Sequence, residues 1–552
     1  MSWIDEAVVY QVYLRSFADG NGDGVGDFAG LTAHLDHVAS LNVDALWLSP
    51  CFQSPQADHG YDVADYTQID PLFGTVAELE AFVTAAHARG LRVMLDLVPN
   101  HCSVEHAWFR VAVGAPAGSQ ARSRFHFADG RGPNGALPPN NWGSVFGGAA
   151  WTRLPDGQWY LHSFDASQPD FNWGCDEVIE MMDDVLRFWF DRGVDGFRVD
   201  VAHGLVKQDG LPDWNGAPGT SNEFMWNQPG VHDVYRRWRK IADEYGACFV
   251  GEVWVASTTD LLAYASPDEL GQAFDFHLLV QPWHAPSIRG AVEHGLRPGT
   301  AWALANHDVH RPATRYGQQQ VVEAPDPTDM LASARRRGPA DLPLGRRRAV
   351  AASMLMLALP GAAYLYQGDE LALPEVLDLP DHVRQDPIWV RSGGSELGRD
   401  GCRVPMPWTA EPATFGFTDA PSAWLPQPGL FGPLSVEVQD RDPWSPLGVV
   451  RRAVDARTRT GLFAGDDLTW LEAGDDVVAF RRGDGVCVLN TSARELVLPD
   501  AWGTVRVSSA PINRRILPTD ACAWLSVAEC DGVSPSPSPS PTPATAGTTK
   551  EQ

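Results

Sequence analysis

The sequence predicts an α/β fold: a (β/α)8 TIM barrel with an inserted subdomain after the third strand and a C-terminal β-sandwich. Short apolar runs recur along the chain, each ends at a polar or turn-forming residue, and helical patterns lie between several of them. Eight of these runs are expected to be parallel barrel strands: Val8–Leu14, Ala45–Leu48, Arg92–Leu97, Gly196–Asp200, Cys248–Glu252, Gln272–Phe276, Ala301–Ala305 and Ala362–Tyr366.

Helical patterns follow the first, second and third strand regions and precede the fourth. We expect helices over Leu31–Leu41, Val76–Arg89 and Val178–Arg192, the last with apolar residues at helical spacing. A doubly wound sheet is the alternative architecture, but eight strand units in series favour a closed barrel.

Three further segments depart from the barrel pattern. The interval between the third and fourth strands is far longer than a barrel loop and rich in Gly, Pro, Asn and Trp, so residues 102–174 are expected to form a subdomain over the barrel mouth. The barrel then comprises residues 1–101 and 175–462. Short alternating runs predict a β-sandwich over 463–530, and the Ser/Pro repeats of 531–552 predict a disordered tail.

Charge and cysteine content narrow the class of partners. The chain has 42 basic and 70 acidic residues, a formal net charge of −28, which repels nucleic acid and anionic membranes. The eight cysteines are dispersed without a C-x-x-C pair, as in reduced cytoplasmic proteins. The first residues lack a signal-peptide pattern, and no run is long and apolar enough to span a membrane. A neutral substrate in the cytoplasm is expected, with the oligomeric state left open.

Acidic side chains lie at the ends of four predicted strands. They are Asp96, Asp200, Glu252 and Asp308. A single acidic residue after a strand is commonly a helix cap, but in a barrel the strand ends meet at one rim, where catalytic groups lie. Four such residues therefore predict an acidic active site.

Glycoside hydrolysis uses such a set of groups. Retaining glycosidases place two carboxyl groups about 5–5.5 Å apart, one as nucleophile and one as acid/base. Arg198 shares its strand face with Asp200 and is expected to hold that carboxylate ionised and oriented. His101 and His307 can donate hydrogen bonds to sugar hydroxyls, and a third carboxylate can stabilise an oxocarbenium-like transition state.

At these residues the chain resembles the α-amylase family of glycoside hydrolases, in its oligo-1,6-glucosidase and α-glucosidase branch. The matching strings occur in the family's order from the first strand to Trp408: YQVYLRSF, DLVPNH (96–101), QPDFNW (168–173), GFRVD (196–200), GEVW (251–254), NHD (306–308), YLYQGDE (364–370) and RDGCRVPMPW (399–408). The resemblance implies that Asp200 is the nucleophile, Glu252 the acid/base and Asp308 the stabiliser of the transition state.

The resemblance also implies how glucose is bound. The residues that it assigns to substrate binding are Asp58, Tyr61, His101, Phe146, Phe164, Gln168, Arg198, His307 and Arg399. Asp58 and Tyr61 bind the non-reducing glucose, and Arg399 closes the end of the pocket together with the aspartate. A closed pocket accepts only a chain end, so we expect an exo-acting enzyme on small oligosaccharides.

A glycine-rich acidic loop follows the first strand. Its oxygen donors, at Asp19, Asn21, Asp23, Val25 and Asp27, suit a hard cation such as Ca²⁺ or Mg²⁺. The resemblance implies a structural ion there, with none required for catalysis.

Linkage preference and reaction class stay open. In this branch a valine after the nucleophile is associated with α-1,6 cleavage, and Val201 stands at that position, but the following residues Ala202–Leu205 depart from the usual pattern. The main expectation is a retaining α-glucosidase on maltose- or isomaltose-type substrates. The alternative is an α-glucosyltransferase or a trehalose-synthase-like isomerase using the same covalent glucosyl-enzyme. A non-enzymatic transporter subunit is disfavoured because all three carboxylates are present.

Overall fold

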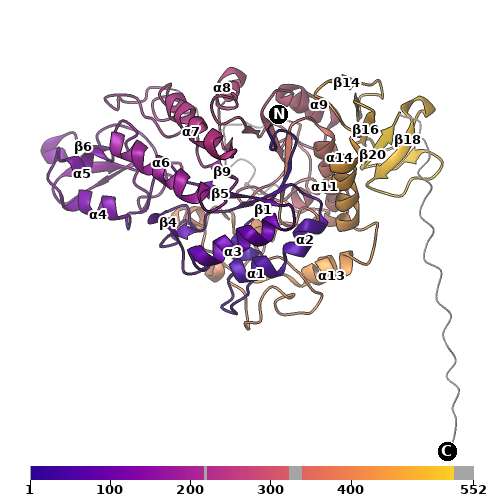
Figure 1. Ribbon diagram of the computed structural model, residues 1–552, viewed down its shortest axis with the longest axis horizontal. Coiled ribbons are helices and arrows are strands. Elements are labelled where there is room, and N and C mark those ends of the chain that lie inside the picture. The colour runs from indigo at the N-terminus through magenta and orange to yellow at the C-terminus, as the bar shows by residue number, and fades with distance from the viewer. Residues whose placement is uncertain (1, 217–220, 256, 323–337, 528–552) are drawn as a thin grey trace, which may run out of the picture.

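The predicted barrel is confirmed. The computed structural model describes residues 2–216, 221–255, 257–322 and 338–527. Eight parallel strands close in the order β1-β13-β12-β11-β10-β9-β5-β2, so each strand pairs with the next barrel strand along the chain (Figure 1). Their bounds are β1 Val8–Val12, β2 Ala45–Leu48, β5 Arg92–Leu97, β9 Gly196–Val199, β10 Cys248–Gly251, β11 Ala273–Asp275, β12 Thr300–Ala303 and β13 Ala362–Tyr366.

Helices cover the outside of the barrel. The principal ones are α1 Phe28–Ala33, α2 Leu35–Ser40, α3 Val76–His87, α6 Asp176–Phe190, α7 Val231–Tyr245, α8 Thr258–Tyr264, α9 Ala285–Gly295, α11 Leu342–Ala358 and α14 Pro446–Thr460. Two of the three predicted helices are found as α3 and α6. The predicted single helix over Leu31–Leu41 was wrong, because the backbone leaves the helical region at His34 (φ −107°, ψ 10°). The segment is therefore divided between α1 and α2.

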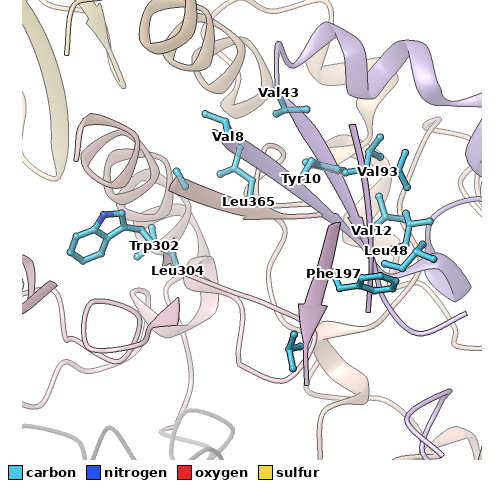
Figure 2. Close-up of a cluster of buried hydrophobic side chains, with 14 of the residues drawn as sticks. Val8, Tyr10, Val12, Val43, Leu48, Val93, Phe197, Trp302, Leu304 and Leu365 are labelled. Carbon is cyan, nitrogen blue, oxygen red and sulfur yellow. The ribbon is translucent and has the colours of Figure 1, made fainter. Parts of the chain in front are cut away.

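The period-two alternation of the strands separates two apolar layers. One face of each strand packs against the helices, as for Val8, Tyr10 and Val12 of β1 (Figure 2). The opposite face fills the barrel interior with side chains such as Trp47 and Phe274. Near the carboxyl ends of the strands this inner face becomes polar, so the packed core supports a polar floor.

Two excursions cover the carboxyl-terminal rim. After β2 the short strands β3 (Phe52–Gln53) and β4 (Asp65–Ile69) form a hairpin. The long interval after β5 holds the helices α4 (Ala107–Gly114) and α5 (Gln120–Ser123) and an antiparallel sheet of β6 (Phe127–Asp129), β8 (Gln158–Leu161) and β7 (Trp151–Arg153). The predicted boundaries of this subdomain, 102–174, remain a proposal.

The C-terminal region is a small sandwich, as predicted. A five-stranded antiparallel sheet runs in the order β14-β15-β16-β20-β18, and a two-stranded sheet pairs β17 (Leu496–Val497) with β19 (Ile516–Leu517). The bounds of the larger sheet are β14 Leu468–Trp470, β15 Val477–Arg482, β16 Gly485–Asn490, β18 Thr504–Ser508 and β20 Ala521–Ser526. The predicted tail, 531–552, lies outside the described residues.

Trp524 of β20 joins this sandwich to the barrel layer. Its indole N–H donates to the backbone oxygen of Met354 in α11 at 3.2 Å, and its ring meets Phe463 edge to face at 4.9 Å. The side chain is fully buried. No helix in the described part of the chain has the length and apolar character needed to cross a membrane.

Replacing Trp524 should therefore destabilise the protein. We expect Trp524→Ala to lower the free energy of unfolding by about 3–5 kcal/mol, the usual range for truncating a buried aromatic residue. Calorimetry and denaturant unfolding measure the effect. Trp444→Ala is the matched control, because Trp444 is 47% exposed and should change little. Equal stability of both variants would show that the Trp524 contact contributes nothing.

Candidate active site

The three predicted catalytic carboxylates lie at the carboxyl ends of barrel strands. Asp200 follows β9 directly, Glu252 follows β10 directly, and Asp308 lies in the loop after β12. All three line one pocket. Its walls are formed by Asp58, Tyr61, His101, Val145, Phe146, Phe164, Asp200, Val201, Glu252, Trp254, Asp308 and Arg399.

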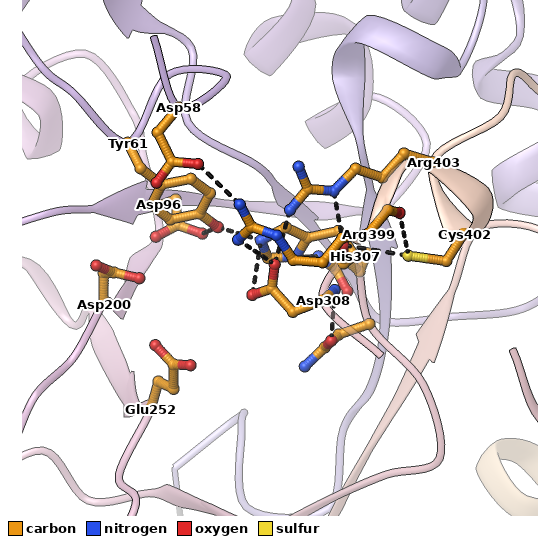
Figure 3. A network of polar contacts seen from close by, with 12 residues as sticks. Asp58, Tyr61, Asp96, Asp200, Glu252, His307, Asp308, Arg399, Cys402 and Arg403 are labelled. Atoms are coloured by element: carbon orange, nitrogen blue, oxygen red, sulfur yellow. Dashed lines mark hydrogen bonds and ion pairs between the residues drawn. The ribbon is translucent and has the colours of Figure 1, made fainter. Parts of the chain in front are cut away.

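Arg198 brings Asp200 and Glu252 together. Its Nη1 lies 2.7 Å from Asp200 Oδ1 and 2.9 Å from Asp96 Oδ1, and its Nη2 lies 2.8 Å from Glu252 Oε2. Because both carboxylates bind one guanidinium, they face the same small volume of the pocket, as Figure 3 shows. The arrangement therefore provides two carboxyl groups for one glycosidic bond.

The electrostatics of this group favour retention of a proton. Burial raises the pKa of Asp200 well above its usual value, and Glu252 and Asp96 raise it further. Arg198 acts in the opposite direction but does not outweigh these effects, contrary to the expectation that it holds Asp200 ionised. Burial likewise raises the pKa of Asp96 to about 7 against the effect of Arg198. Since three buried carboxyl groups share one guanidinium, the group as a whole can hold a proton near neutral pH. A retaining glycosidase needs such a proton for its leaving group.

Val201 connects the turn after β9 to Glu252. Its backbone N–H donates to Glu252 Oε2 at 3.1 Å. Its φ is +44°, a left-handed conformation that a β-branched residue rarely adopts. The strained turn after β9 thus points both the Asp200 carboxylate and a backbone donor toward the site.

Asp308 has a different environment, because two guanidinium groups contact its carboxylate. Its Oδ1 lies 3.0 Å from Arg399 Nη1 and 2.8 Å from Arg403 Nη2, and its Oδ2 lies 3.3 Å from His307 Nε2 (Figure 3). Burial alone would raise the pKa of Asp308, but His307, Arg399 and Arg403 outweigh it and hold the pKa well below the usual range. Asp308 is therefore ionised across the range of working pH.

Arg399 ties together three carboxylates from separate parts of the chain. Besides Asp308, it contacts Asp58 through Nη2 at 2.9 Å and Asp386 through Nε at 2.7 Å. Burial raises the pKa of Asp58 to about 6, although Arg399 and Arg403 act in the opposite direction. The predicted pairing of Asp58 with Arg399 is found, and Asp386 is an additional partner.

The remaining predicted binding residues surround the same pocket. The Tyr61 ring lies parallel to His307 at 5.3 Å, and its hydroxyl lies 2.5 Å from His307 Nε2. The Gln168 amide nitrogen donates to Asp58 Oδ2 at 3.2 Å and lies 3.3 Å from His101 Nε2. His101 contacts Phe164 at 5.0 Å between ring centres.

Both histidines are neutral, but only His101 lines the pocket, where it can form hydrogen bonds with sugar hydroxyls. The same expectation for His307 was wrong, because its ring is fully buried and its two nitrogen atoms lie against Gln11 and Tyr61. Burial lowers the pKa of His101 to about 4 and that of His307 to about 3, in each case against a neighbouring aspartate. Six of the nine predicted binding residues line the pocket, and the other three support it from behind. The supporting residues are Gln168, Arg198 and His307.

Sequence reasoning missed several residues of the site. Val145 and Trp254 line the pocket, while Asp386 and Arg403 hold the groups around Asp308. Trp254 and Arg403 lie inside the matched strings GEVW and RDGCRVPMPW, so their closeness to functional residues was a usable signal. No pattern in the sequence distinguishes Val145 or Asp386.

In the predicted cation loop, the carboxylate oxygens accept hydrogen bonds from nearby backbone N–H groups. Asp19 Oδ1 accepts from the backbone N–H of Asn21 at 3.0 Å, Asp23 Oδ1 accepts from Val25 at 2.9 Å, and Asp27 Oδ1 caps α1 through Gly30 at 2.7 Å. An oxygen-only set fits Ca²⁺ or Mg²⁺. None of these residues lines the pocket. The structural ion stays a prediction.

A second cluster with metal-ligating residue types lies between β11 and α9. Within the described residues, ligand atoms of Asp275, His277 and His294 lie within 4.8 Å of one another. Arg297 Nη2 is 2.6 Å from Asp275 Oδ2 and 3.1 Å from His294 Nδ1. A guanidinium therefore already supplies positive charge to this carboxylate, and we interpret the cluster as an ion-paired contact between strand and helix.

A closed barrel with paired carboxylates in a pocket at its carboxyl-terminal rim defines a glycoside hydrolase of the (β/α)8 class. The chain matches the α-amylase catalytic domain over residues 11–465, and it therefore belongs to the α-amylase family.

Curated relatives extend over most of the chain. A probable α-glucosidase of Rhizobium meliloti is 37% identical over 500 residues, covering 85% of each chain. A trehalose-6-phosphate hydrolase of Bacillus subtilis is 34% identical and covers 80% of each chain. An oligo-1,6-glucosidase of Parageobacillus thermoglucosidasius is 32% identical, covering 82% of this chain and 83% of its own.

Solved structures agree in fold. An α-glucosyl transfer enzyme is 35% identical with a TM-score of 0.82, covering 95% of this chain and 99% of its own. The trehalulose synthase of Pseudomonas mesoacidophila is 28% identical with a TM-score of 0.82 and the same coverage, 95% and 99%. Hydrolases and glucosyl-transferring enzymes thus share this architecture.

Loss of the Arg399 charge should change the ionisation of Asp308. In Arg399→Gln, the pKa of Asp308 should rise toward its usual value, because one of the charges that lower it is removed. A carbon-13 NMR titration of the Asp308 carboxyl group measures this rise, which should be about one pH unit. Arg441→Gln is the control, since Arg441 is an exposed partner of Glu437. An unchanged titration of Asp308 in Arg399→Gln would contradict the electrostatic role.

Proposed function

We propose that the protein is a retaining, exo-acting α-glucosidase that releases α-D-glucose from the non-reducing end of short α-glucosides. The observation that carries this proposal is the pair Asp200 and Glu252, bound to the two terminal nitrogen atoms of Arg198 at the wall of one pocket. Membership of the α-amylase family and the glucosidases among its relatives support it.

The proposed reaction has two displacement steps. The reacting form of the coupled group is the one in which Glu252 carries the proton and Asp200, beside Arg198, is ionised. Asp200 attacks the anomeric carbon as the bond to the glycosidic oxygen breaks, and Glu252 gives its proton to that oxygen. Glu252 then takes a proton from water as the water oxygen displaces Asp200, which restores both carboxyl groups and retains the α configuration. Asp308, kept ionised by its cationic neighbours, stabilises the positive charge that develops on the sugar ring. These side chains supply nucleophile, acid and base, so catalysis requires no cofactor.

The shape of the pocket supports exo action. Arg399 joins Asp58 to Asp308, and both carboxylates line the pocket together with Tyr61. A sugar chain cannot continue through this ion-paired wall, so the wall is the proposed contact for the terminal glucose hydroxyls. The substrate is then a small oligosaccharide that enters by its non-reducing end.

The charge of the pocket favours a neutral aglycone. Among the described residues that line it, the one cationic side chain is Arg399, which is already paired with three carboxylates. A phosphorylated substrate would need a free cation there. Neutral maltose- or isomaltose-type sugars therefore fit better than the substrate named for the trehalose-6-phosphate hydrolase relative.

The second candidate is transfer of glucose to a sugar hydroxyl, as in an α-glucosyltransferase or a trehalose-synthase-like isomerase. The structural similarity to an α-glucosyl transfer enzyme and to a trehalulose synthase favours it. The covalent intermediate is the same, and the two reactions differ in whether water or a sugar attacks it. Val201 lines the pocket beside the nucleophile and supports α-1,6 preference through the branch association, with α-1,4 as the alternative.

We further propose a cytoplasmic location and a structural Ca²⁺, or Mg²⁺, in the Asp19–Asp27 loop. The seven cysteines among the described residues are unpaired, which suits a reducing compartment. The oxygen donors of the loop support the ion.

Removing either reacting carboxylate should abolish turnover without unfolding the protein. Asp200→Asn and Glu252→Gln should each lower kcat/KM on maltose by about four orders of magnitude, the scale seen when one member of a catalytic group is lost. Both amides can still accept from Arg198, so the thermal midpoint should not fall. Asp209→Asn and Glu223→Gln are the controls, because they make the same chemical changes at exposed positions. Near-normal rates in either active-site variant would refute its role.

Product analysis should separate the candidate reactions. Proton NMR during early turnover should show α-glucose from maltose or isomaltose, with attack at the chain end and no internal cleavage of starch. Initial rates on maltose, isomaltose, sucrose and trehalose give the linkage preference. Early β-glucose would exclude retention, and disaccharide products exceeding free glucose at high maltose concentration would favour the transferase.

A further inference from the structure

Trp254 is the pocket residue closest in sequence to the acid/base, two positions after Glu252. Its indole N–H donates to Glu252 Oε1 at 2.9 Å. The side chain is 6% exposed and forms part of the pocket wall. Neither the family resemblance nor the proposed two-step reaction assigns a role to this side chain.

The two oxygens of Glu252 have different partners. Oε2 accepts from Arg198 Nη2 at 2.8 Å and from the backbone N–H of Val201 at 3.1 Å. The donor to Oε1 is the neutral indole of Trp254. A proton on Oε2 would compete with two donors, one of them cationic, whereas Oε1 has room for a proton beside a single neutral donor. Oε1 is therefore the oxygen that carries the transferable proton.

Packing fixes the direction of the Trp254 donor. The indole stacks on Phe276, which follows β11, with ring centres 4.2 Å apart and an interplanar angle of 17°. Phe276 in turn stacks on Phe274 inside the barrel at 5.5 Å. Because the barrel core holds the indole, its N–H is oriented independently of Glu252 and can orient the carboxyl group.

We propose that Trp254 is a positioning residue that aims Oε1 of Glu252 first at the glycosidic oxygen and then at the attacking water. This inference rests on the proposed α-glucosidase function. In the first step the proton leaves Oε1 for the glycosidic oxygen, which receives the electron pair of the breaking C–O bond. In the second step Oε1 takes a proton from water as the bond between glucose and Asp200 breaks. The indole N–H keeps one lone pair of Oε1 occupied in both steps and leaves the other facing the pocket.

Leaving-group dependence tests this role. Trp254→Phe removes the N–H and keeps a ring against Phe276. For aryl α-glucosides of similar size, kcat/KM should fall about tenfold when the leaving group is phenol, part of the roughly hundred- to ten-thousandfold that a positioned proton donor supplies. It should change less than about twofold when the leaving group is dinitrophenol, which departs without protonation. For that activated substrate, kcat should fall together with KM, because attack by water still needs the base.

Equal losses of kcat/KM on both aryl glucosides would overturn the proposal, since a change in pocket shape or binding affects them alike. Unchanged kinetics on both would also overturn it. Trp226→Phe is the matched control, because it makes the same change at an indole whose ring centre lies 6.2 Å from that of the pocket residue Phe164. This variant should leave the dependence on the leaving group unaltered.

Glu252→Gln, measured with the same aryl glucosides, separates failure of the acid/base assignment from failure of the role proposed for Trp254. It should show a still steeper dependence on the leaving group. If it shows none, the acid/base assignment itself fails. If it behaves as expected while Trp254→Phe resembles the wild type, only the role of Trp254 fails.

Discussion

A single buried guanidinium organises the reacting groups. Arg198 lies in the polar floor of the barrel and contacts Asp96, Asp200 and Glu252. Without it, three carboxyl groups would be buried close together with no cation, which is strongly unfavourable. Because side chains alternate along a strand, placing Arg198 on the inner face of β9 places Asp200 there too. The constraint that orients the Asp200 carboxyl group is thus built into the strand.

A second guanidinium completes the pocket from a distant part of the chain. Arg399 reaches back to Asp58 after β2 and to Asp308 after β12, and is itself held by Asp386. The two cationic centres act differently. Three carboxyl groups share Arg198 and a proton is retained there, whereas Asp308 contacts two guanidinium groups and is kept ionised. One rim therefore provides both a proton donor and permanent negative charge.

The barrel and the acidic residues at its rim could be predicted because local patterns determine them. All eight strands were predicted from apolar runs, and Asp200, Glu252 and Asp308 were found at strand ends. Residues that act through tertiary contacts were not predictable in this way. Asp386 caps the short helix α12 (Pro387–Arg391), and only the folded chain brings Arg399 against it. The division between α1 and α2 at His34 was also not predicted, because the apolar spacing of the sequence continues through the backbone turn.

The left-handed backbone at Val201 links the shape of the pocket wall to the position of Glu252. Its side chain contributes to the wall of the pocket, while its backbone N–H donates to Glu252. Exchanging valine for a smaller or unbranched residue would relax the torsional strain as well as widen the wall. A substitution at this position would consequently change two things at once, the shape of the pocket wall and the alignment of the Glu252 carboxyl group.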